Sequence, residues 1–464
     1  MIHPDCLAHL QQRLKPHQIR LNGDIDASYQ KDWSHCEPTV PLALLLPENT
    51  QDVSDIIKIC SQYKQSLVPQ GGRTGLAGAA TPLQNDICLS LEKITGIEEV
   101  DIQANTITVL AGTTLQTVQE SAISFERYFP MDFGARGSCQ IGGAIATNAG
   151  GNNVIRFGMM RDLVLGLEVV TANGEILNLQ NKMLKNNVGY DLKQLFIGSE
   201  GTLGIITKAT LKIMATPGEA KTVLCALNSY EDGVALLHLL QQELNQNIHA
   251  FEMMWQDFYT MSCSWVCPDS LPIDNNYTIY VLVESKGCDD DTFNKSLEKA
   301  FEAGLIQDAV IASSLRERNK LWEIRETTSE FTVRLTPISF DVSLPIGSIN
   351  DFSQACSAQL RERWPNIDIV NFGHIGDSNL HLTVDANSDG DITEQAVDDI
   401  VYACVEQFKG SISAEHGIGI LKRDYLHHSV TPQALDMMSV VKKALDPLNI
   451  LNPSKVLLIS SSVI

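Results

Sequence analysis

The sequence predicts an α+β protein of more than one domain, for three reasons. Its 464 residues exceed the size at which one hydrophobic core normally stops growing. Short β-branched and apolar runs alternate with stretches whose apolar residues recur at helical spacing. The long glycine-rich loops stop between Ala215 and Lys221, and the pattern beyond is typical of an antiparallel sheet layered with helices. We therefore expect a helical lead-in over residues 1–36, domains over 37–216 and 217–420, and a C-terminal helix and tail over 421–464.

The first half is expected to alternate strands and helices. Apolar residues recur with a period of about 3.6 over residues 49–64, which predicts a helix. β-branched residues alternate over 106–112, which predicts a strand. Asn173 and Gly174 predict the turn of a hairpin over 162–179, because this pair adopts the backbone conformations that two-residue turns need.

The second half is expected to form a sheet with helices between its strands. The predicted strands cover residues 222–228, 277–285, 338–346, 367–374 and 380–386. The predicted helices cover residues 230–244, 290–304 and 393–408. A last helix begins near Thr431 and leads into a tail rich in Pro and Asn.

The composition limits the classes of partner. The net charge is −22 and the pI about 4.8. Nucleic-acid binding needs a basic stripe, so we exclude it. An anionic substrate would be repelled by the overall field, so its site must supply local positive charge from a metal ion or from Arg.

A cytoplasmic protein is predicted, because the sequence shows no targeting signal that we can identify and its cysteines follow no disulfide pattern. No run of about 18 apolar residues predicts a membrane span. Residues 1–20 lack the apolar core of a signal peptide and the composition of a transit peptide. The 11 Cys are scattered without a C-x-x-C pair, which argues against a disulfide framework, a zinc knuckle and an iron–sulfur motif. We interpret them as reduced, mostly buried thiols.

Glycine-rich loops over Pro69–Gly78 and Gly137–Gly151 predict a dinucleotide site, and Gly198–Gly204 adds a third such turn. The Rossmann and P-loop patterns are absent. Glycine lets the backbone approach a ligand closely, and successive N–H groups form anion sites that suit a pyrophosphate. The alternative is that these loops are tight turns between strands.

Histidine and acidic residues gather in two short segments of the second half. His374 and His381 flank the turn of a predicted hairpin, and Glu415 directly precedes His416. Two imidazoles and a carboxylate make a three-ligand site with open positions, as in catalytic zinc sites, although iron and manganese accept the same donors. The alternative is that these histidines are ordinary surface or hydrogen-bonded side chains.

A basic segment over residues 315–334 is helical by pattern. Arg and Glu alternate in it, so most of its charges are expected to be solvated partners on one helix. A carboxylate substrate needs a planar, bidentate donor, for which Arg is best shaped. The pattern alone does not select which Arg plays this role.

Together these motifs resemble a known family. P-Q-G-G-R-T-G, G-S-x-Q-I-G-G and G-S-E-G-T-L-G-I-I-T are similar to the FAD domain of the vanillyl-alcohol oxidase / p-cresol methylhydroxylase superfamily. G-H-I-G-D-S-N-L-H-L, S-A-E-H-G-I-G and D-P-L-N-I-L-N-P-S-K-V-L resemble the C-terminal half of its D-lactate, glycolate and D-2-hydroxyglutarate dehydrogenase branch, with most similarity to the last. The resemblance implies an α+β fold with a two-subdomain p-cresol methylhydroxylase-type FAD-binding domain over 37–216. It also implies an antiparallel-sheet substrate and metal (cap) domain with flanking helices over 217–420, and a C-terminal segment over 421–464 that returns to the FAD domain.

The resemblance also implies which residues bind FAD. Some relatives attach FAD covalently through a His that follows the two glycines of the first loop. Arg73 occupies that position here, so non-covalent FAD is expected. The implied FAD-binding residues are Gln70, Gly71, Gly72, Arg73, Thr74, Gly75, Leu76, Gly137, Ser138, Ile141, Gly142, Gly143, Asn148, Gly150, Gly151, Gly201, Gly204, Ile205, Ile206 and Asn452.

For the second domain the resemblance implies a divalent metal ion, with zinc expected, held by His374, His381 and Glu415. It implies that Arg325 grips the substrate carboxylate and that His416 is the general base. Ser329 replaces a Thr of the family's substrate site. The implied reaction oxidises a D-2-hydroxy acid to the 2-oxo acid, with the hydroxyl proton passing to the base and a hydride to flavin N5.

The substrate expected first is D-2-hydroxyglutarate, with D-lactate or glycolate as the alternative. Ser339 stands where human-type enzymes carry a Lys, and Thr383 stands where they carry an Asn. These changes remove contacts to a second carboxylate, which favours the alternative. Arg334 is a candidate replacement for the missing cation.

Electrons are expected to leave to a separate acceptor, an electron-transfer flavoprotein or a quinone, because no iron–sulfur or nicotinamide motif is present. A homodimer is one expected assembly. Two other classes stay open from the residues alone: a metal-dependent hydrolase without flavin, and a flavin-bearing accessory subunit without turnover. The four candidate residues His374, His381, Glu415 and His416 argue against the accessory subunit, which has no need of them.

Overall fold

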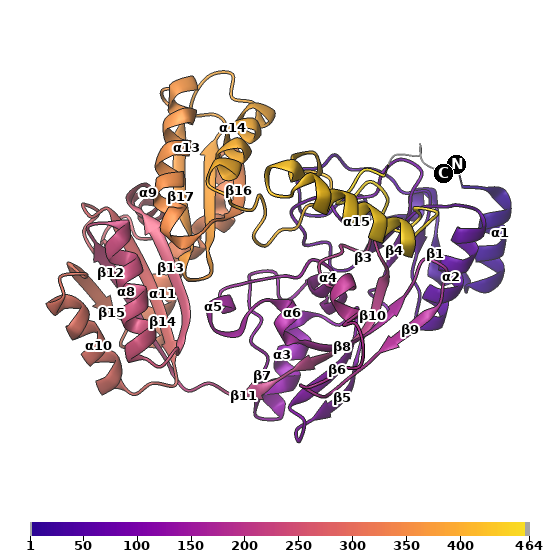
Figure 1. Cartoon of the computed structure of the whole chain (residues 1–464), viewed down its shortest axis with the longest axis horizontal. Coiled ribbons are helices and arrows are strands. Elements are labelled where there is room, and N and C mark those ends of the chain that lie inside the picture. The colour runs from indigo at the N-terminus through magenta and orange to yellow at the C-terminus, as the bar shows by residue number, and fades with distance from the viewer. Residues whose placement is uncertain (1, 460–464) are drawn as a thin grey trace. The chain divides into compact units, whose positions relative to one another are not determined.

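A computed structural model describes residues 2–459, and the chain divides into two compact units (Figure 1). The first unit contains the chain up to Gly151, Phe157–Thr216, and the chain from Glu415 onward. The second unit contains Asn152–Arg156 and Pro217–Ala414.

The first unit contains a small, mostly parallel sheet. Its strand order is β1-β2-β4-β3, in which β2, β4 and β3 are parallel and β1 is antiparallel to β2. Helices α1 (Pro4–Arg13) and α2 (Thr50–Gln62) share a core with this sheet. The side chain of Asn49 accepts from the N–H of Asp52, which caps α2 and confirms the helix predicted there. The strands are β1 (Ile19–Arg20), β2 (Leu44–Leu45), β3 (Leu67–Gln70) and β4 (Ile87–Ser90).

A five-stranded antiparallel sheet forms the other half of the first unit, in the order β5-β6-β10-β8-β9. Helices α3 (Leu115–Ser124) and α4 (Ile141–Ala146) pack against its core. The predicted hairpin is confirmed, because β8 and β9 pair around Gly174, whose φ is +78°. The strands are β5 (Ile97–Asp101), β6 (Thr106–Leu110), β8 (Val164–Val170), β9 (Ile176–Leu179) and β10 (Ile205–Lys212).

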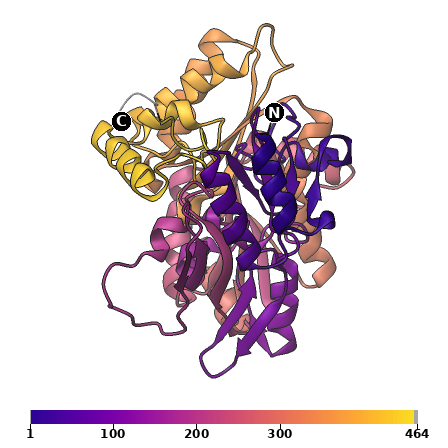
Figure 2. The same ribbon diagram turned by 90° about the vertical axis from the view of Figure 1, so that its right-hand side faces the viewer.

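Shorter elements complete the first unit. A long loop joins β9 to α7 (Lys193–Phe196) (Figure 2). Val188 and Tyr190 in this loop are exposed. The C-terminal helix α15 (Pro432–Leu445) is followed by a tail in which Leu451 bridges to Leu67 of β3. The remaining elements are η1 (Pro16–Gln18), η2 (Asn22–Asp24), η3 (Ala27–Tyr29), β7 (Arg127–Tyr128), α6 (Met160–Leu163), β11 (Met214–Ala215) and η7 (Arg423–His428).

The second unit contains a seven-stranded sheet in the order β15-β12-β14-β13-β17-β18-β16, and every neighbouring pair is antiparallel. This confirms the antiparallel layer expected from the sequence. Two of its strands, β13 and β15, were missed, because neither shows the alternation of a half-buried strand. The strands are β12 (Ala220–Leu227), β13 (Ile248–Trp255), β14 (Ile279–Lys286), β15 (Asp308–Ile311), β16 (Pro337–Ser343), β17 (Asp368–His374) and β18 (Asn379–Asp385).

Helices cover both faces of this sheet. α8 lies against the face of Met253, whose side chain meets Gly233. α9 and α11 share a core with the opposite face through Met254 and Phe372. Further along that face, the strands β18 and β16 carry His381 and Asp341. The helices of this unit are α5 (Val154–Phe157, at its edge), α8 (Tyr230–Glu243), α9 (Gln256–Val266), α10 (Asp290–Glu302), α11 (Leu315–Arg325), η4 (Glu326–Glu330), α12 (Phe331–Arg334), η5 (Ile346–Ser348), α13 (Ile349–Arg363), η6 (Ile375–Asp377) and α14 (Glu394–Gln407).

Candidate active site

The three glycine-rich loops meet in the first unit. A Cβ atom on Gly72 would lie 2.0 Å from the carbonyl oxygen of Ser138, so the first two loops touch backbone to backbone. A Cβ on Gly201 would lie 2.4 Å from Cγ of Pro69, which brings the third loop to the first. Only glycine fits such close approaches. The three loops that the sequence predicts to bind a dinucleotide therefore lie next to one another, and their binding role stays a prediction.

The C-terminal tail joins the same place through Asn452. Its Nδ2 donates to the carbonyl oxygens of Ala79 at 3.0 Å and Glu200 at 2.7 Å. Its Oδ1 has no hydrogen-bond partner among residues 2–459, and the same holds for Oε1 of Gln70 and of Gln140. Three buried acceptors without donors suit a ligand that brings its own N–H and O–H groups, as the flavin and ribityl parts of FAD do.

The other predicted FAD residues differ in what they contact. Arg73 has a φ of +56° and lies over the ring of Tyr29 at 4.2 Å, with Glu92 at 3.9 Å. Asn148 accepts from the N–H of Arg161 and so supports the local fold. A group of them packs against protein atoms in the cores or against neighbouring backbone, namely Ile141, Gly142, Gly151, Gly204, Ile205 and Ile206. The roles of these residues in binding FAD stay predictions, as do those of Gly71, Thr74, Gly75, Leu76, Gly137, Gly143 and Gly150.

The predicted histidine hairpin forms in the second unit. β17 ends at His374, a tight turn follows in which Ser378 has a φ of +75°, and β18 returns with His381 opposite Phe372. A Cβ on Gly373 would lie 2.4 Å from the carbonyl oxygen of Asn379, so the hairpin closes tightly only with glycine there. The two imidazole centroids are 5.4 Å apart.

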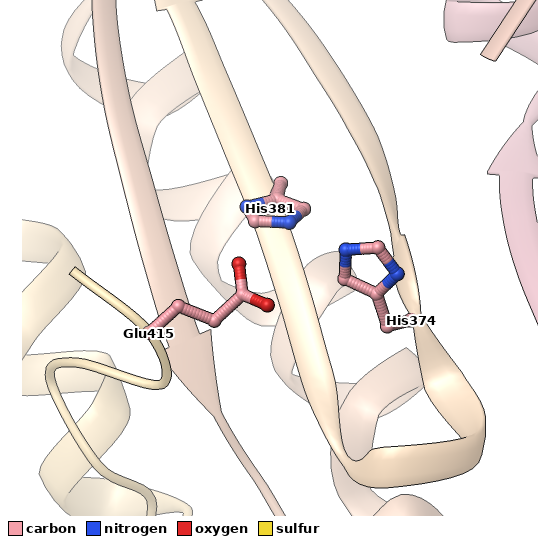
Figure 3. A group of neighbouring side chains, drawn as sticks. All are labelled: His374, His381 and Glu415. Atoms are coloured by element: carbon pink, nitrogen blue, oxygen red, sulfur yellow. The ribbon is translucent and has the colours of Figure 1, made fainter. Parts of the chain in front are cut away.

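The predicted carboxylate joins the two imidazoles (Figure 3). One donor atom from each of His374, His381 and Glu415 lies within 4.8 Å of the others. Such a donor set fits a divalent cation with open positions for a substrate. The sequence segment of Glu415 is held by Asp341, which stands opposite His381 and accepts from the N–H of Ala414 at 3.2 Å.

A buried ionic network lies behind His374. Oε1 of Glu252 is 2.7 Å from Nδ1 of His374, and Nε of Arg325 donates to Oε2 of Glu252 at 2.7 Å. Burial by itself raises the pKa of the Glu252 carboxyl, but the charges and hydrogen bonds of His374 and Arg325 outweigh it and lower that pKa below its ordinary value. The carboxylate is therefore ionised, and it accepts from both neighbours.

The predicted catalytic residues divide into two groups. Arg325 is buried beside His374, with its Nη2 3.5 Å from Nε2 of the imidazole. Ser329 is exposed, and its Oγ donates to the carbonyl oxygen of Glu326. The role of Ser329 stays a prediction.

His416 follows Glu415 in a loop that one carboxylate organises. Glu200 accepts from the N–H groups of Ile418 at 2.7 Å and Gly419 at 2.8 Å. Burial raises the pKa of Glu200, and the two backbone donors offset only part of that effect. Glu200 thus fixes the loop that carries the proposed base.

Several residues of these networks were not singled out from the sequence. Glu252 is a lone acid in an apolar strand, and an acid buried in such a strand almost always has a partner. That signal was available and was missed. Asn379 stands two residues before His381 on the same face, is 3% exposed, and has no side-chain partner in the part of the chain that the structure describes. Its burial could not be known from the sequence.

Comparison with known families decides the assignment. The FAD binding domain family matches residues 41–180, and the family of C-terminal domains of FAD linked oxidases matches residues 216–456. The chain belongs to the FAD-linked oxidases. This FAD-linked oxidase is 34% identical to a D-2-hydroxyglutarate dehydrogenase of Stutzerimonas stutzeri, over 98% of this chain and 99% of that protein. It is 37% identical to a D-2-hydroxyglutarate dehydrogenase of Xanthomonas citri pv. viticola, over 96% of this chain and 95% of that protein.

A solved structure of p-cresol methylhydroxylase shares the fold of this FAD-linked oxidase. The TM-score is 0.78 at 15% identity, and the match covers 97% of this chain and 96% of that chain. This structure confirms the fold class predicted from the motifs, and the family matches and the relatives confirm the family resemblance. The chain is an FAD-dependent oxidoreductase, which excludes the flavin-free hydrolase. Among its described residues, no helix has the length and apolar character to span a membrane.

Proposed function

We propose that this FAD-linked oxidase converts a D-2-hydroxy acid to the 2-oxo acid with a divalent metal ion, for which we expect zinc. The observation that carries the proposal is the grouping of His374, His381 and Glu415 within 4.8 Å. The names of the relatives supply the substrate class, and D-2-hydroxyglutarate is the first candidate. In this proposal the first unit holds FAD, and the sheet of the second unit supplies the two metal-binding imidazoles.

The chemistry of the chain's own residues fits this reaction. When bound, FAD would supply the two-electron acceptor and the metal ion a Lewis acid for the substrate oxygens. Arg325 would bind the substrate carboxylate through its terminal nitrogens, because the Nε of Arg325 already donates a hydrogen bond to Glu252. His416 would remove the proton of the substrate hydroxyl, as a general base does.

A second candidate is a monocarboxylate such as D-lactate or glycolate. Ser339 and Thr383 lie opposite each other on β16 and β18, and their hydroxyls are 3.0 Å apart. They lie two positions along the strands from Asp341 and His381, so they are the next pair on the same face of the sheet. A neutral hydroxyl pair offers no charge to a second carboxylate, which supports this candidate.

Arg334 is a poor source of the missing charge. Its Nε lies 3.5 Å from a carboxylate oxygen of Glu330, and its guanidinium lies over the ring of Trp265 at 5.1 Å. The guanidinium of Arg334 would have to leave Glu330 and Trp265 before it could contact a substrate. We further propose that the electrons pass to a separate acceptor, an electron-transfer flavoprotein or a quinone.

The test is anaerobic bleaching of the bound flavin by a panel of D- and L-2-hydroxy acids of three to five carbons. We expect rapid bleaching by D acids and little by L acids. The ratio of rates for D-2-hydroxyglutarate and D-lactate chooses between the two candidates. Protein stripped with a chelator should bleach slowly and recover when Zn²⁺ is restored; full bleaching by stripped protein would contradict the metal assignment.

A further inference from the structure

Glu252 is a buried carboxylate to which the reaction as proposed gives no role. It is 0% exposed on β13 and lies directly opposite His374 in the β13–β17 pair. Burying a charge is costly unless hydrogen bonds and an opposite charge compensate for it. The partners of this carboxylate should therefore explain why it is buried here.

The two oxygens of Glu252 hold different partners. Oε1 meets Nδ1 of His374 at 2.7 Å, and Oε2 accepts from Nε of Arg325 at 2.7 Å. An ionised carboxylate only accepts, so the proton of the imidazole belongs on Nδ1. In the neutral imidazole, the form that binds a metal ion, Nε2 then keeps its lone pair. The Nη2 of Arg325, always a donor, lies 3.5 Å from Nε2, which agrees with this tautomer.

The same network continues to the second imidazole through an aromatic ring. The guanidinium of Arg325 lies over the ring of Phe372 at 4.8 Å, and Phe372 stacks on His381 with centroids 5.0 Å apart. Arg325 is thus fixed on one side by a carboxylate and on another by a ring face, so few orientations are left to it.

We propose that Glu252 is a positioning residue that sets the tautomer of His374 and the direction of Arg325 together, a role that rests on the proposed function of those two residues. The carboxylate of Glu252 then leaves the lone pair of His374 Nε2 available to a cation. It also orients the terminal N–H groups of Arg325 toward a substrate carboxylate. Carboxylates that accept from the second nitrogen of a metal-binding imidazole act in this way.

The substitution Glu252→Gln tests the role with little change of shape. An amide has one acceptor oxygen and one donor nitrogen. Because Nε of Arg325 always donates, the amide oxygen must face it and the NH₂ must face His374. Nδ1 then has to accept, which moves the imidazole proton to Nε2. We expect this change in the ¹⁵N spectrum of the His374 ring, and an affinity for Zn²⁺ that falls about 10–100-fold in competition with a chromophoric chelator.

Glu284→Gln is the matched control. Glu284 is also buried, on the neighbouring strand β14, but it accepts from Nε of Arg318 at 2.6 Å and from Nε1 of Trp322 at 3.0 Å. It should leave the His374 tautomer and the Zn²⁺ affinity at wild-type values, although both variants can lower the melting temperature. An E252Q protein with the proton still on Nδ1 and wild-type Zn²⁺ affinity would overturn the proposal.

Two further outcomes distinguish a failure of the role proposed for Glu252 from a failure of the proposed metal-dependent reaction. If the wild-type protein needs no metal for turnover, the metal chemistry is wrong, and the His374 tautomer in E252Q still decides whether Glu252 positions the ring. If E252Q does not fold, the wild-type spectrum decides, because a proton on Nε2 in the metal-free wild-type protein would overturn the proposal.

Discussion

At the scale of the residue, single carboxylates organise the groups proposed for catalysis. Glu200 holds the backbone after His416, Asp341 holds the backbone before Glu415, and Glu252 holds His374. Each carboxyl group lies within hydrogen-bond distance of a backbone or ring nitrogen in, or close along the chain to, a residue proposed for the reaction. These hydrogen bonds restrict the positions of the individual segments, which suits a reaction that depends on orientation.

His416→Ala tests the proposed base. We expect the rate of flavin reduction by a D-2-hydroxy acid to fall by about 10²–10⁴-fold, because a general base contributes that much. FAD content should stay at the wild-type level, and both are measured in one anaerobic stopped-flow series. His427→Ala is the control, since His427 is an exposed residue of the same C-terminal segment. Reduction as fast as in the wild-type protein would show that His416 is not the base.

At the scale of the element, β13 carries two buried polar residues, of which one is charged and the other neutral. Glu252 is charged and paired, whereas His249 is 2% exposed and near the carbonyl oxygen of Asn247 at 3.1 Å. The pKa of His249 is lowered to about 4, mainly by burial; Lys286 and Arg156 contribute to the lowering, whereas the hydrogen bond to Asn247 and the charge of Glu284 act in the opposite direction. The folded protein therefore keeps this imidazole neutral in mild acid.

The pKa of His249 predicts a loss of stability in acid. The unfolded chain takes up the proton near pH 6.5 and the folded chain only near pH 4, so the free energy of unfolding falls as the pH drops through that window. We expect His249 to account for about 2–3 kcal/mol of that loss at pH 4.5. Urea unfolding at pH 7, 5.5 and 4.5 should show a smaller loss for His249→Gln than for the wild-type protein.

His238→Gln serves as the control for this pH series, because His238 is exposed on α8 of the same unit. It should lose stability as the wild-type protein does. Equal losses in all three proteins would mean that the pKa of His249 in the folded chain is close to its ordinary value of 6.5.

At the scale of the whole molecule, the net charge of −22 opposes an anionic substrate. Added salt screens this repulsion, since the Debye length shrinks to about 8 Å at physiological ionic strength. We expect kcat/KM to rise on the order of a few-fold between low salt and physiological ionic strength, and to rise more for a dicarboxylate than for a monocarboxylate. A fall with added salt would show that local positive charge dominates the approach of the substrate.

The sequence by itself determined the local features of this protein. Apolar spacing predicted the helix over residues 49–64, Asn173 and Gly174 predicted a hairpin, and the glycine loops and histidine segments predicted the family and its cofactor. Caps, turns and periodicity act over a few residues, so they can be read along the chain.

Only the tertiary structure decided which distant residues meet. Glu252 contacts His374 across 122 positions, and Ser339 contacts Thr383 across 44. Such pairs depend on which strands become neighbours and in which register, and a shift of one residue would turn every side chain to the other face. Glu252 indicates that β13 needs a polar partner, but the apolar residues around it do not indicate which strand supplies that partner.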